Sequence, residues 1–192
     1  MTERTPSTTA AQPVDLTKGP GAPEAVRPPL ADSLFGAVTV TVATHARVTV
    51  SGSAIPRTVL VRDPGAARPD PHVAIGTRAA AELTLSVDGV PAGIRPGKGR
   101  IRRSTYKVDA THDGARYRLT PTSLATSRFT RDGRHLADFT ADGDETVLVE
   151  WHPDADPRPV DASLGYALAA AYGTGGQPMW VTLIDVIAEL IP

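Results

Sequence analysis

Residues 161–172 read Asp-Ala-Ser-Leu-Gly-Tyr-Ala-Leu-Ala-Ala-Ala-Tyr, a run of small and apolar side chains that begins with one acidic residue. Alanine and leucine favour a helix, and Asp161 suits the cap position before its first turn. Leu164, Leu168 and Tyr172 share one face at helical spacing, and most of the remaining positions are also small or apolar. A helix that is apolar on all sides must be buried, so this stretch predicts a fold that covers it.

The covering layer is predicted to be antiparallel β-sheet, because apolar and polar residues alternate from Leu34 onward. In the clearest run, 82–88, Leu83, Leu85 and Val87 face one side. Further strand-like runs lie at 38–42, 48–50, 58–62, 72–76, 104–109, 116–120, 127–130, 134–140 and 146–151. We therefore expect a mainly β fold, an antiparallel barrel or sandwich built of hairpins, with one or two apolar C-terminal helices.

Asp-Gly pairs mark the turns between the later strands, at 88–89, 113–114, 132–133 and 142–143. Both residue types tolerate the positive φ angles that two-residue hairpin turns require. The pairs therefore predict that consecutive strands form an antiparallel meander.

Two terminal segments complete the predicted organisation. Residues 1–32 carry too few large apolar side chains to offset the entropy of ordering them, so we expect a disordered tail before one domain at 33–192. After a Gly-rich break, Pro178 opens a second apolar stretch from Met179 to Ile191, predicted to be a helix at 178–191. At about 20 Å this helix is too short for a bilayer core of about 30 Å. We expect it to be core or a homo-oligomer interface.

Composition limits the possible chemistry. The chain has 192 residues and no cysteine, which excludes disulfides, thiolate metal sites and cysteine nucleophiles. A formal net charge of −1 argues against a strongly basic nucleic-acid binder. We see no secretory leader and no apolar run of about 18 residues, so we expect a cytoplasmic protein without a transmembrane segment. Abundant Ala, Gly, Pro and Arg with scarce Lys is typical of a high-GC bacterial genome.

The charges are unevenly distributed along the chain. Between Pro91 and Thr120 there are only two acidic residues, Asp109 and Asp113. The same stretch contains eight basic residues: Arg95, Lys98, Arg100, Arg102, Arg103, Lys107, Arg116 and Arg118. Between Asp138 and Asp156 there are acidic residues but no Lys or Arg. This segregation predicts one basic and one acidic face.

The strongest candidate for binding is the segment Gly97-Lys98-Gly99-Arg100-Ile101-Arg102-Arg103. Its glycines let the backbone approach an anion, and the side chains of Lys98, Arg100, Arg102 and Arg103 could pair with an anion's oxygens. Neither Ser nor Thr follows Lys98, so the segment is not a nucleotide P-loop. The partner would be an acidic protein or an anionic lipid headgroup. The alternative is a solvated loop leading into a charged edge strand.

A second hypothesis is an enzyme. His152, Asp154 and Asp156 would share one side of an extended segment and could ligate a metal or act in a small-molecule site. A metal would need a further ligand from elsewhere, and the alternative is a Pro-rich acidic turn. We find no G-x-S-x-G nucleophile motif and expect no cofactor, so a non-enzymatic binding or scaffolding module is preferred.

The hairpins followed by an Ala-rich helix resemble the tubby-like and LURP-one-related proteins. The resembling residues lie between Thr105 and Tyr172, chiefly Arg-Phe-Thr-Arg-Asp-Gly at 128–133 and the Ala-rich run at 161–171. The resemblance implies an antiparallel barrel around a hydrophobic C-terminal helix and a mostly non-enzymatic role. Some members bind phosphoinositides through basic residues, a role that would fall here to Lys98, Arg100, Arg102 and Arg103. This chain departs from the pattern by its Gly-rich break and second apolar stretch.

Overall fold

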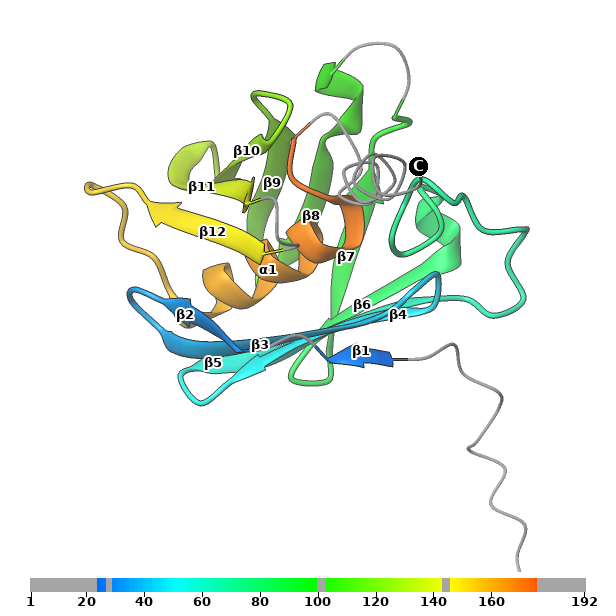
Figure 1. Cartoon of the computed structure of the whole chain (residues 1–192), viewed down its shortest axis with the longest axis horizontal. Helices are drawn as coiled ribbons and strands as arrows, with labels where there is room; N and C mark the ends of the chain where they lie inside the picture. Colours follow the sequence, from blue (N-terminus) through cyan, green and yellow to red (C-terminus); the bar gives the residue numbers. More distant parts are fainter. Residues whose placement is uncertain (1–23, 27–28, 100–102, 143–145, 176–192) are drawn as a thin grey trace, which may run out of the picture.

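The computed structural model describes residues 24–26, 29–99, 103–142 and 146–175, which form a mainly β structure around one α-helix (Figure 1). The strands are β1 (Glu24–Val26), β2 (Leu30–Asp32), β3 (Gly36–Ala43), β4 (Arg47–Gly52), β5 (Ile55–Arg62), β6 (Leu83–Val87), β7 (Val90–Pro96), β8 (Val108–His112), β9 (Ala115–Pro121), β10 (Thr126–Arg131), β11 (Arg134–Asp142) and β12 (Thr146–Trp151). The α-helix is α1 (Pro159–Tyr172), and two 3₁₀ turns are η1 (Ala80–Glu82) and η2 (Arg103–Tyr106).

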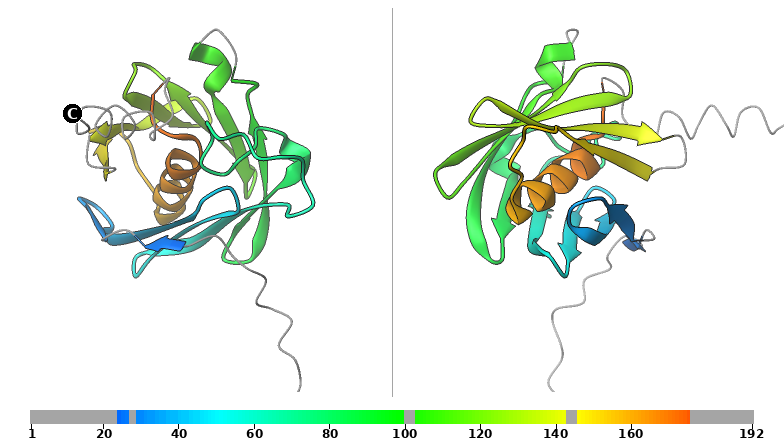
Figure 2. Two further views of the ribbon diagram at one scale, coloured as in Figure 1. Left: turned by 45° about the vertical axis from the view of Figure 1, so that its right-hand side comes forward. Right: turned by 90° about the vertical axis from the view of Figure 1, so that its left-hand side faces the viewer.

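The described strands belong to one antiparallel sheet that follows chain order. The order is β1-β3-β4-β5-β6-β7-β8-β9-β10-β11-β12, and β2 pairs with β3 beside β1. The sheet curls into a nearly closed barrel, which Figure 2 shows from two further sides. In Figure 1, strands β3 to β6 lie below α1 and strands β10 to β12 above it. The predicted antiparallel meander is thus confirmed.

The Asp-Gly turns explain why the strands follow chain order so closely. Asp88, Asp113 and Asp132 have φ of 47°, 47° and 51°, and the glycine after each also has positive φ. Positive φ at both central residues is the type I′ geometry, whose twist matches that of the flanking strands. Three of the predicted turns are therefore confirmed, and Gly143 of the fourth lies outside the described residues.

The core of the barrel is α1 itself, which is buried at every residue from Asp161 to Tyr172. Leu164 and Leu168 are fully enclosed, and each such burial contributes about 1.5–3 kcal/mol. Phe139 of the sheet meets the Tyr166 ring edge-on, with ring centroids 5.5 Å apart. The helix therefore fills the barrel instead of covering one face of the sheet.

The helix begins at Pro159, three residues before the start that a cap at Asp161 predicts. Pro159 takes the first helical position, where its fixed φ and missing N–H are tolerated. Asp161 is accordingly not the cap residue but lies in the first turn. Its carboxylate accepts the backbone N–H of Arg158 at 2.7 Å and pairs with the guanidinium of Arg131. Negative charge in the first turn stabilises the unpaired N–H groups there. Asp161 therefore contributes to capping from the third helical position, not from the cap position.

Two strand predictions need correction. Residues 72–76 form turns and bends, and their apolar Val73 and Ile75 are buried in the core without being part of a strand. The Ile75 N–H bonds to the Ala171 carbonyl at 3.2 Å. The strand predicted at 104–109 begins only at Val108, since η2 occupies the residues before it.

The described structure extends into the predicted N-terminal tail but does not reach the predicted second helix. Strands β1 and β2 carry the sheet back to Glu24, into the last residues of the segment predicted as a tail. The segment from Met179 to Ile191, predicted to be a second helix, lies outside the described residues.

A buried carboxylate holds the two ends of the sheet to the helix. Asp32 of β2 accepts the indole N–H of Trp151 from β12 at 3.1 Å and the hydroxyl of Tyr166 from α1 at 2.8 Å. It also accepts the backbone N–H groups of Leu34 and Phe35. Because β2 and β12 share no described ladder, these side-chain bonds close the barrel at this point.

A substitution at Gly165 would test how closely α1 packs against the sheet. In an uncrowded helix, Gly165→Ala would stabilise the protein by about 1 kcal/mol. Here an added Cβ would lie 2.4 Å from Cζ of buried Phe139. We therefore expect a loss of about 1–3 kcal/mol from overpacking, measured by urea unfolding. A gain in stability would contradict the packing.

Tyr117 predicts how stability depends on alkaline pH. Burial of its side chain and, next, the charge of Asp161 raise the pKa of Tyr117 to about 12. Between pH about 10 and about 12 the folded protein keeps the Tyr117 proton, whereas the unfolded chain has lost it. The stabilisation that the raised pKa provides is therefore fully present below pH about 10 and is lost toward pH about 12. Tyr117→Phe should make the free energy of unfolding fall less steeply over that range. An unchanged slope in a urea series would refute this.

Candidate functional site

The predicted binding segment joins β7 to β8 at one end of the barrel. Lys98 is exposed, and Arg103 is the first residue of η2. Arg100 and Arg102 lie outside the described residues. The grouping of these four side chains therefore remains a prediction.

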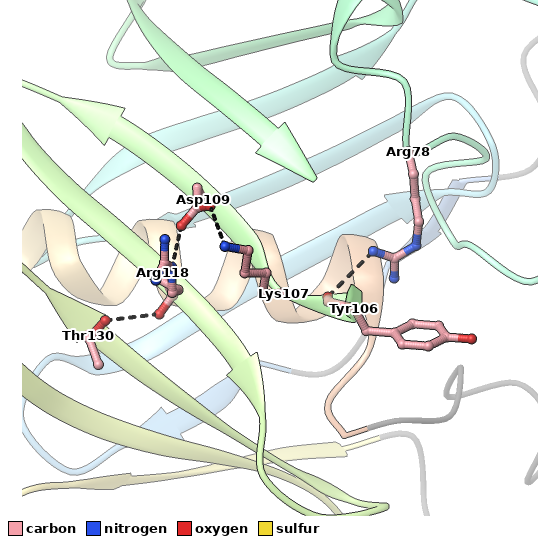
Figure 3. A network of polar contacts seen from close by, with 6 residues as sticks. All are labelled: Arg78, Tyr106, Lys107, Asp109, Arg118 and Thr130. Carbon is pink, nitrogen blue, oxygen red and sulfur yellow. Dashed lines mark hydrogen bonds and ion pairs between the residues drawn. The ribbon is translucent and has the colours of Figure 1, made fainter. Parts of the chain in front are cut away.

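Arg78 holds both flanks of this segment against the barrel. Its guanidinium donates to the carbonyls of Gly97 at 3.3 Å and Tyr106 at 3.4 Å (Figure 3 shows the second bond). It lies over the rings of Tyr106 and Tyr172, 5.1 Å from each centroid. Burial lowers the pKa of Arg78, and the two tyrosines oppose that shift. Arg78 thus ties the segment to the C-terminal end of α1.

A basic surface lies beside this segment, on the outer face of β7, β8 and β9. Strand register places Arg95 opposite Asp109, and Asp109 opposite Arg118. Lys107 lies two residues before Asp109, and Arg116 two residues before Arg118, so all five belong to the same outer face. Between them, Val108 and Tyr117 point into the core. The alternation of the strands thus gathers charges that the sequence spreads over 95–118.

These side chains line a groove with a volume of about 610 Å³. Its lining is Gly93, Ile94, Arg95, Pro96, Gly97, Lys107, Asp109, Ala110, Thr111, Arg116, Tyr117 and Arg118. A smaller hollow of about 350 Å³ shares Asp109, Arg116 and Arg118 and reaches Thr130 and Asp132. Four cations and one carboxylate give the larger groove a formal charge of +3. We call it the basic groove.

Asp109 occupies the middle of the basic groove. Nε of Arg118 donates to its Oδ1 at 2.5 Å, and Nζ of Lys107 lies 3.8 Å from its Oδ2 (Figure 3). The bond to Asp109 raises the pKa of Arg118. Arg95 and Arg116 form no ion pair with any described residue. These two guanidinium groups remain free to pair with a ligand.

The sequence pattern missed the strand that forms one wall of this groove. In β7, Pro91, Gly93 and Pro96 interrupt the alternation expected of a strand. The glycine has a packing reason, because a Cβ on Gly93 would lie 2.3 Å from Oγ1 of Thr111 on β8. The useful signal was the excess of basic residues between Pro91 and Thr120, which already contained Arg95, Lys107, Arg116 and Arg118.

The predicted metal or enzyme segment follows β12. Asp154 and Asp156 are exposed, and the backbone N–H of Asp154 lies 3.4 Å from Nδ1 of His152. The ring of His152 is 4.9 Å from that of His135, whose Nε2 lies 3.1 Å from a carboxylate oxygen of Asp138. Among the described residues, no three His, Asp or Glu side chains are arranged to hold a metal ion.

Comparisons with protein-family models, curated proteins and solved structures give no significant match. Within the described part of the chain, no helix combines the length and the apolar character needed to cross a membrane.

Arg78 should control the order of the segment that it holds. Arg78→Leu removes two hydrogen bonds and both ring contacts, while Arg78→Lys keeps the charge. The N–H of Gly97 bonds to Lys107 at 2.8 Å and that of Gly99 to Thr105 at 3.0 Å. We expect both amides to exchange hydrogen at least about tenfold faster in Arg78→Leu, with amides of β4 unchanged. Unaltered exchange at Gly97 and Gly99 would show that Arg78 does not hold the segment.

Proposed function

We propose that this protein is a non-enzymatic binding module that engages an acidic segment of a partner protein through the basic groove. The observation that carries the proposal is the placement of Arg95, Lys107, Arg116 and Arg118 around a single carboxylate in one groove. Guanidinium groups pair carboxylates in a two-pronged geometry, and a surface of one sign steers an oppositely charged partner toward it.

The exposure of these cations indicates what kind of binding to expect. Lys107 and Arg118 are 41% and 42% exposed. Exposed ion pairs contribute about 0.2–1 kcal/mol each and are screened by salt. Four of them give a weak, salt-sensitive association, which suits a transient partner. A groove also suits an extended peptide better than a flat bilayer.

The resemblance to tubby-like and LURP-one-related proteins is part of the same proposal. What supports it is the arrangement of a curled antiparallel sheet around an apolar C-terminal helix. The mostly non-enzymatic role of that family agrees with a binding module.

Charge reversal in the groove provides the test. Arg95→Glu with Arg116→Glu should weaken binding of a fluorescent oligoglutamate peptide roughly tenfold or more at low salt, because two attractions become repulsions. Fluorescence anisotropy at two salt concentrations measures the effect. The matched control is Arg47→Glu with Arg57→Glu, which makes the same charge change at exposed positions on β4 and β5.

An equal loss in the control pair would mean that net charge, not the groove, governs binding. Vesicles containing phosphatidylserine, compared with vesicles of phosphatidylcholine alone, form the second arm. Groove-dependent binding to the anionic vesicles, without binding to the peptide, would replace the acidic protein by a lipid surface as the partner.

A further inference from the structure

Asp109 has an unusual position for a residue of a basic binding surface. Among the described residues, Asp109 is the only carboxylate that lines the basic groove. Its side chain is 28% exposed, and it lies on β8, the middle strand of the groove. Arg118 of β9 donates to it on one side, and the strand register places Arg95 of β7 opposite it on the other. A carboxylate there has the surroundings that an acidic ligand would seek.

The contacts of Asp109 leave other cationic groups of the basic groove without an ion-pair partner among the described residues. Arg118 donates to Oδ1 of Asp109 through its Nε, at 2.5 Å. Lys107 is 3.8 Å away, an ion pair that is too long for a hydrogen bond. Arg95 and Arg116, on the two outer strands of the groove, have no described ion-pair partner. These free cationic groups therefore lie on either side of a position that the Asp109 carboxylate already occupies.

We infer that Asp109 is the specificity-determining residue of the basic groove, because its carboxylate stands where a partner's single carboxylate would otherwise bind. This inference rests on the proposed function. A ligand with one acidic group can pair with Arg95 or with Arg116 but not with both at once, and it meets the repulsion of Asp109. A ligand with several acidic groups reaches Arg95 and Arg116 together and gains pairs that Asp109 cannot satisfy. The groove therefore selects polyacidic segments over isolated acidic side chains.

The strand geometry gives the spacing of such a ligand. The outer strands β7 and β9 lie about 10 Å apart, since neighbouring strands are separated by about 4.8 Å. Acidic residues two apart in an extended peptide are separated by about 7 Å, and the long arginine side chains span the difference. An extended segment with acidic residues at alternate positions fits these limits.

The test compares two peptides on the full chain. One carries a single glutamate within a Gly/Ser peptide of fixed length, and the other carries three glutamates at alternate positions. Anisotropy at low salt gives both dissociation constants for the wild type, for Asp109→Asn and for Asp138→Asn. Asp138 is the matched control, because it also pairs with an arginine, Arg128 at 3.9 Å, but lies on β11 outside the groove.

We expect Asp109→Asn to tighten binding of the single-glutamate peptide several-fold more than binding of the triple-glutamate peptide. The preference for the polyacidic peptide then falls, while Asp138→Asn leaves it unchanged. Asp109→Ser is the second variant, and thermal unfolding of each variant verifies the fold.

Failure of the inference and failure of the proposed function give different results. If the wild type binds the triple-glutamate peptide through Arg95 and Arg116 but Asp109→Asn leaves the preference unchanged or weakens both peptides, the role of Asp109 is overturned. If the wild type binds neither peptide, the proposed function fails, and the role of Asp109 fails with it.

Discussion

Burial of an almost entirely apolar helix is the constraint on which this structure depends. A buried helix must satisfy its terminal N–H and C=O groups without bulk water. At the start of α1, Asp161 accepts the Arg158 N–H and pairs with Arg131, while at the end the Ala171 carbonyl accepts the Ile75 N–H. Removing one partner of a buried pair typically costs about 3–5 kcal/mol, so Arg131 and Asp161 depend on each other.

Closure of the barrel depends on the same helix. The sheet has a seam where β2 and β12 meet without a described ladder, and Asp32 bridges it by bonding to both Trp151 and Tyr166. Phe35 packs edge-on against the Trp151 ring, with centroids 5.6 Å apart. The helix is thus both the core of the barrel and part of its closure.

The basic groove lies on the outside of the wall whose inner side packs against this core. Tyr117 and Val108 point inward, which forces Arg116, Arg118, Lys107 and Asp109 outward on neighbouring strands. Core packing therefore fixes the register, and the register fixes which charges become neighbours. A binding surface built this way has rigid backbone positions but flexible side chains, which suits weak and charge-selective association.

The sequence by itself determined the local features: alternating strands, Asp-Gly turns, a helix that had to be buried and an excess of basic residues between Pro91 and Thr120. These follow from short periods and turn chemistry, which neighbouring residues encode. Only the tertiary structure decided that the helix fills a barrel, that β7 is a strand despite its prolines, and that Asp109 lies among four cations. The contact between Asp32 and Tyr166 shows the reason, because it joins residues 134 positions apart, and no local pattern reports a partner at that distance.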